Sequence, residues 1–123
     1  MRLDDFVNQK LYDLLVAGQA TAEANGRDII EPRDLPITKG LQERMNEFKK
    51  LEVQLQLKPI LERLAMMPKL DLDYSDSTRE RLPELMGALT ISLARLFKLL
   101  DSELKNPRTE HWEKALGIFN LLL

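Results

Sequence analysis

The chain has 123 residues, of which 44% are hydrophobic and 31% are charged, with a net charge of −2 and no cysteine. This composition is typical of one globular domain, and it excludes a disordered chain, disulfides and thiolate metal sites. We see no segment of roughly 18 apolar residues that could span a bilayer and no signal-peptide pattern, so we expect a cytoplasmic protein. Proteins that neutralise phosphates usually carry a basic excess, which is absent here.

The first part of the chain predicts two helices joined by a short bridge. Apolar residues recur at three- and four-residue steps from Leu3 onward, which is the helical period. Asn25-Gly26 ends this helix, because both residues tolerate a left-handed backbone. The pair Ile29-Ile30 suits a single β-bridge. A second helix, opened by Pro32, is expected to run to about Lys50 with these residues on one face: Ile37, Leu41, Met45 and Phe48.

The second part predicts a short helix, an acidic loop, a long helix and a last helix. Residues 51–57 alternate polar and apolar, which fits a strand or a helix, and we favour a helix or a short connector. A short helix over 58–67 is followed by an extended acidic loop over 69–76. The long helix then runs to about Leu104, and Pro83 either kinks it or marks its first turn. A bridge over 104–106 leads to a last helix over 107–123, whose inward side chains are predicted to be Trp112, Leu116, Phe119 and Leu122.

A repeated pattern indicates an internal duplication. Pro32-Arg33 is followed by Lys39 and Leu41, and Pro107-Arg108 by Lys114 and Leu116, at identical offsets. Short helix, loop, long helix, bridge and short helix is also the order of the histone fold. The chain resembles a small family of bacterial and archaeal-type doublet histone-fold proteins of unassigned function. The motifs that carry the resemblance include Asn25-Gly26-Arg27-Asp28, Asp34-Leu35-Pro36-Ile37-Thr38-Lys39-Gly40-Leu41, Leu57-Lys58-Pro59 and Phe119-Asn120-Leu121-Leu122-Leu123.

The resemblance implies an all-α, fused pseudodimer in which two long central helices cross. Residues 1–123 then form one domain, with a truncated first half-fold over 1–50 and a complete second half-fold over 57–123. The first copy lacks its N-terminal short helix. The apolar stripe through Leu11 and Leu15 is therefore expected to lack one cover, which a second copy or another protein would supply.

The resemblance also implies a structural ion pair between Arg27 and Asp34. Such a pair would hold the bridge against the start of the next helix, where the carboxylate also meets the helix dipole. The second copy has Ser102 and Thr109 at the matching positions and so lacks the pair.

Histone-like DNA binding is the alternative that the resemblance raises. The first-loop arginine of histones matches Arg2 in the first half and Asp73 in the second, and the bridge threonines are replaced by Ile29 and Leu104. Arg2, Lys105 and Arg108 remain candidate phosphate contacts, sufficient only for weak, salt-sensitive binding in the nucleoid. The DNA hypothesis gains if six basic residues gather into one stripe: Lys49, Lys50, Arg95, Lys98, Lys105 and Arg108.

The sequence predicts no enzyme. Its only histidine, His111, lacks a second histidine or a facial carboxylate pattern for a metal, and no serine has a histidine partner. No glycine-rich phosphate loop is present. We expect no catalytic residue, cofactor or metal, and a structural or protein-interaction role.

Overall fold

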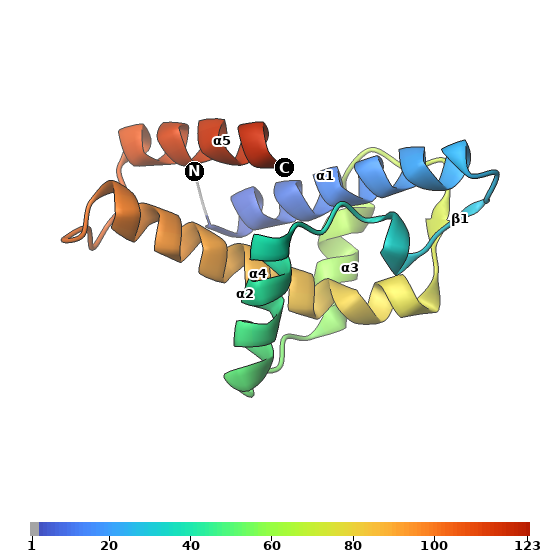
Figure 1. Ribbon diagram of the computed structural model, residues 1–123, viewed down its shortest axis with the longest axis horizontal. Helices are drawn as coiled ribbons and strands as arrows, with labels where there is room; N and C mark the ends of the chain where they lie inside the picture. Colours follow the sequence, from blue (N-terminus) through green and yellow to red (C-terminus); the bar gives the residue numbers. More distant parts are fainter. Residues whose placement is uncertain (1–2) are drawn as a thin grey trace.

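The computed structural model describes residues 3–123 and is dominated by helices (Figure 1). This confirms the all-α class. In chain order the elements are α1 (Leu3–Ala24), β1 (Ile29–Ile30), the short 3-10 helix η1 (Pro32–Asp34), α2 (Lys39–Lys50), α3 (Leu57–Ala65), β2 (Asp73–Tyr74), α4 (Asp76–Leu100) and α5 (Thr109–Leu122).

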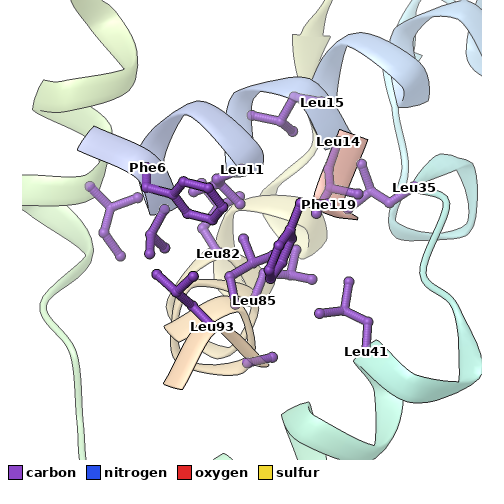
Figure 2. Close-up of a cluster of buried hydrophobic side chains, with 14 of the residues drawn as sticks. Phe6, Leu11, Leu14, Leu15, Leu35, Leu41, Leu82, Leu85, Leu93 and Phe119 are labelled. Atoms are coloured by element: carbon purple, nitrogen blue, oxygen red, sulfur yellow. The ribbon is translucent and has the colours of Figure 1, made fainter. Parts of the chain in front are cut away.

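The core lies between the two long helices α1 and α4, which run across the middle of the molecule (Figure 1). Figure 2 shows leucines of both helices meeting the aromatic rings of Phe6 and Phe119. The two rings pack edge to face, with centroids 5.1 Å apart. Leu11 and Leu15 are fully buried in this cluster. The expectation that their stripe lacks a cover is therefore wrong, because α4 and α5 supply side chains that close it.

The helix predicted from Pro32 to Lys50 is interrupted. The turn η1 ends at Asp34, residues 35–38 are not helical, and α2 begins only at Lys39. Pro36 explains the break, since a proline disfavours the helical conformation in the residue before it, and Leu35 is extended (φ −74°, ψ 135°). Thr38 then caps α2, its Oγ1 accepting a hydrogen bond from the Leu41 amide at 3.1 Å.

The long second-half helix is shorter than predicted. α4 ends at Leu100 because Asp101 is extended (φ −155°, ψ 108°) and its carboxylate accepts a hydrogen bond from the Glu103 amide at 3.0 Å. The segment 104–106 carries no strand, and α5 begins at Thr109. Pro83 lies inside α4, whose N-cap is Ser75.

The bridge predicted at Ile29-Ile30 is confirmed and joins the two parts of the chain. β1 pairs in parallel with β2, with Ile29 opposite Asp73 and Ile30 opposite Tyr74. Buried Thr78 strengthens the joint, its hydroxyl donating to the Ile30 carbonyl at 2.8 Å.

A second joint between the two parts is the packing of α2 on α4. The Phe48 ring lies so close to Gly87 that a Cβ atom added there would be 2.3 to 2.5 Å from three ring carbons. Glycine is thus required for this approach. Residues 3–50 and 57–123 therefore share one core.

Candidate functional site

Arg27 and Asp34, the last residue of η1, form a bidentate ion pair. Arg27 Nη1 and Nη2 lie 2.7 and 2.5 Å from the two carboxylate oxygens, and the Glu31 amide donates to Asp34 Oδ2 at 2.8 Å. The Asp34 side chain is only 1% exposed. The hydrogen bond from Arg27 lowers the pKa of Asp34, against the effect of burial, and the same contact raises the pKa of Arg27. Both carboxylate oxygens of Asp34 are thus hydrogen-bonded within the protein.

The structure describes two of the three candidate phosphate contacts, Lys105 and Arg108. Arg2 lies outside the described residues. Lys105 is exposed in the turn after α4. Arg108 is exposed too, and its guanidinium lies 3.1 Å from the Glu110 carboxylate. A phosphate would compete with that carboxylate.

The six basic residues that the DNA hypothesis needs are also interspersed with acids. Lys49 Nζ lies 3.5 Å from Glu84, and Arg95 Nη2 lies 2.7 Å from Glu47. Lys98 donates to the Leu104 carbonyl at 2.9 Å. Three of the six basic residues, Lys49, Arg95 and Arg108, are thus already paired with carboxylates.

His111 stabilises a helix start. It is buried at the beginning of α5, and its Nδ1 accepts a hydrogen bond from the Arg108 amide at 3.0 Å.

In residues 3–123 no group of three or more His, Cys, Asp or Glu is placed to hold a metal ion. No helix in the same range is long and apolar enough to cross a membrane.

A surface groove of about 850 Å³ lies between the start of α2, the second half of α4 and the end of α5. Its walls are mainly apolar, and two of its leucines are strongly exposed, Leu99 at 84% and Leu122 at 70%. Leu122 was predicted to face inward, which is wrong. Large exposed apolar patches mark binding surfaces on soluble proteins.

The charged side chains that line the groove are all basic among the described residues. Arg44, Arg95 and Lys98 line it, and no acidic residue does so among the described ones. Behind the wall, the Glu47 carboxylate lies 2.9 Å from Arg44 Nε and 2.7 Å from Arg95 Nη2. The hydrogen bond from Arg95 lowers the pKa of Glu47. Arg44 Nη2 also lies 3.7 Å from Glu43 Oε2, so each arginine on the wall has a carboxylate neighbour.

The groove was not predicted from the sequence. It is built from three segments that are far apart along the chain, and each alone has the pattern of an ordinary amphipathic helix. The only local signal is the continuation of leucines at the end of the chain, which the helical period assigns to the core.

Comparison with known proteins gives the family. A family model described as a domain of unknown function (DUF1931) matches residues 1–120. The chain belongs to this family. An uncharacterized protein of Aquifex aeolicus (strain VF5) is 30% identical over 95 residues, covering 77% of this chain and 56% of that protein. The DUF1931 chain therefore spans little more than half the length of that relative.

Two solved structures share the fold of the DUF1931 chain. A crystal structure of a Thermus thermophilus protein is 53% identical with a TM-score of 0.91, covering 97% of this chain and 80% of that one. A crystal structure of an Aquifex aeolicus protein is 24% identical with a TM-score of 0.75, covering 98% of this chain and 82% of that one. The second likeness concerns the fold alone.

Proposed function

We propose that this DUF1931 chain is a histone-fold doublet that acts as a non-enzymatic protein-interaction module. The doublet is supported by the two joints between its parts. β1, the bridge of the first half, pairs with β2 in the first loop of the second half, and α2 packs on α4. A chain that holds both halves of such a dimer needs no second subunit to complete its core.

The observation that carries the interaction role is the groove between α2, α4 and α5. Leu99 and Leu122 expose most of their surface beside it. Apolar area removed from water contributes about 25 cal/mol per Å², so a partner that covers these side chains gains binding free energy there. A concave apolar surface with a few polar groups is the usual form of a binding site.

Architectural DNA binding has less support. The loop beside β1 carries Asp71, Asp73 and Asp76, and its neighbour Arg27 is occupied by Asp34. Phosphate would be repelled at this end of the molecule, where histones hold DNA. A gel shift with duplex DNA at low and physiological salt tests this point, and retention at physiological salt would refute the proposal.

Two matched glycine variants test the interaction role. Gly40 lines the groove and Gly117 does not, yet both lie in helices where an added Cβ meets no atom within 4 Å. Gly40→Leu should narrow the groove at a position where the Cβ has room, while Gly117→Leu makes the same change elsewhere. Proteins that co-purify from the native host should be lost with Gly40→Leu and kept with Gly117→Leu. Equal recovery with both variants contradicts the proposal.

A further inference from the structure

We infer that the groove binds an amphipathic helix of a partner protein that presents apolar side chains on one face and carboxylates beside them. This inference rests on the proposed function and adds the chemistry of the partner. The inference rests on three observations: the walls of the groove are apolar, the charged side chains that line it are basic, and exposed leucines leave one side open to a partner.

The apolar walls define the face of the partner. Helices α2, α4 and α5 surround the groove, with leucine and isoleucine side chains at its surface: Leu41, Leu96, Leu99, Ile118 and Leu122. Grooves walled by helices receive amphipathic helices, whose apolar side chains recur at three- and four-residue steps. Because Leu99 and Leu122 are so exposed, the groove is open along its length and admits a helix laid upon it.

The charge defines the flank of the partner. Arg44 and Arg95 share Glu47, and Arg44 also lies 3.7 Å from Glu43, whereas exposed Lys98 has no carboxylate partner within 4 Å among the described residues. The amino end of α2 also points its positive dipole end toward this wall, at Thr38 and Gly40. Carboxylates on the partner would meet the exposed side chains of Arg95 and Lys98 and the amino end of α2.

The same charge argues against a second copy and against nucleic acid. In a two-fold symmetric dimer the same patch lies on both subunits, so the arginines and Lys98 would face their own copies. Like charges facing each other across an interface disfavour a wrong partner. Nucleic acid would leave the apolar walls in contact with a polar backbone.

Two synthetic peptides provide the test. One is a helix of about 20 residues built from leucine, alanine and glutamate, long enough to be helical alone, and the other has lysine in place of glutamate. Their binding to the full chain is measured by fluorescence anisotropy at low salt, with Gly40→Leu and Gly117→Leu as variants. A double variant, Arg95→Gln with Lys98→Gln, removes two cations from the wall.

The acidic peptide should bind roughly tenfold more tightly than the basic one, as expected for two or three exposed ion pairs. Gly40→Leu should weaken it by about tenfold or more, and Gly117→Leu should leave it unchanged, because one apolar anchor in a groove contributes at least this much. The double variant should remove most of the preference for the acidic peptide.

Other outcomes overturn the inference in distinguishable ways. If both peptides bind equally and both are lost with Gly40→Leu, the groove is a docking site but the charge preference is wrong. If sedimentation shows a dimer that Gly40→Leu converts to a monomer, the occupant is a second copy. If neither peptide binds while partners still depend on Gly40, the partner is not such a helix. If Gly40→Leu changes nothing in either assay, the proposed function fails as well.

Discussion

Replacing Gly87 by alanine should destabilise the protein, although alanine is the better helix former. Gly87 lies within α4, and an added Cβ would sit 2.3 Å from Cδ1 of Phe48 on α2. Three ring carbons are affected, including Cγ, which lies at the root of the ring and cannot swing away. The helices would have to separate, or the Phe48 ring would have to leave its place.

The magnitude follows from two opposing terms. Alanine is preferred over glycine by about 1 kcal/mol inside a helix. Overpacking a close contact costs about 3 kcal/mol at the upper end of its usual range, which applies because all three ring carbons would lie within 2.5 Å of the added Cβ. The net loss is about 2 kcal/mol. For a chain of 123 residues this corresponds to a fall in Tm of about 8 °C.

Calorimetry or thermal circular dichroism would measure the change, with Gly117→Ala as the matched control. An added Cβ at Gly117 meets no atom within 4 Å, so this variant should gain up to about 1 kcal/mol. Phe48→Ala should cost about 3 kcal/mol alone, and the double variant should lose about 3 kcal/mol less than the sum, because the overpacking cost disappears with the ring. A Gly87→Ala protein as stable as Gly117→Ala would refute the packing of α2 on α4.

Three further predictions concern the bridge. The pKa of Asp34 is lowered in the folded state, so its ionised form stabilises the fold above the ordinary pKa of 3.8, and this stability is lost as pH falls through the lower pKa of the folded state. The difference in Tm between wild type and Asp34→Asn should therefore be present at neutral pH and disappear in acid. Thr78→Val leaves the buried Ile30 carbonyl with one donor fewer and should lower the free energy of unfolding in urea by about 1 to 2 kcal/mol. An unchanged free energy of unfolding would contradict the hydrogen bond between Thr78 and Ile30. Gly26→Ala should cost about 1 kcal/mol in the same assay, because φ is +70°, whereas an unchanged midpoint would exclude a left-handed residue there.

The sequence predicted the parts of the fold that local chemistry determines. The helical period from Leu3, the stop at Asn25-Gly26 and the bridge at Ile29-Ile30 all depend on residues within a few positions of one another. The break before α2 was missed because the helix opened by Pro32 was continued through Pro36, although a proline also restricts Leu35 before it. The early end of α4 depends on a turn around Asp101 that helix periodicity does not reveal.

The candidate site depends on distances that the sequence does not contain. Arg27 and Asp34 were paired by resemblance, and only the structure gives their bidentate geometry. The groove requires the ends of α2 and α5 to meet on one side of α4. Leu122 continues the apolar period of α5, yet it lies exposed, because periodicity identifies a face of a helix and not what covers that face.

The most direct test of an apolar groove that binds protein uses a photo-cross-linking residue at Ala94, which lines the groove and is exposed. A control carries the same residue at Glu113, which is exposed on α5 and does not line the groove. Irradiation of the native host should yield protein adducts from position 94 that disappear when Gly40→Leu is added. Adducts to nucleic acid, or the same protein adducts from position 113, would contradict the account.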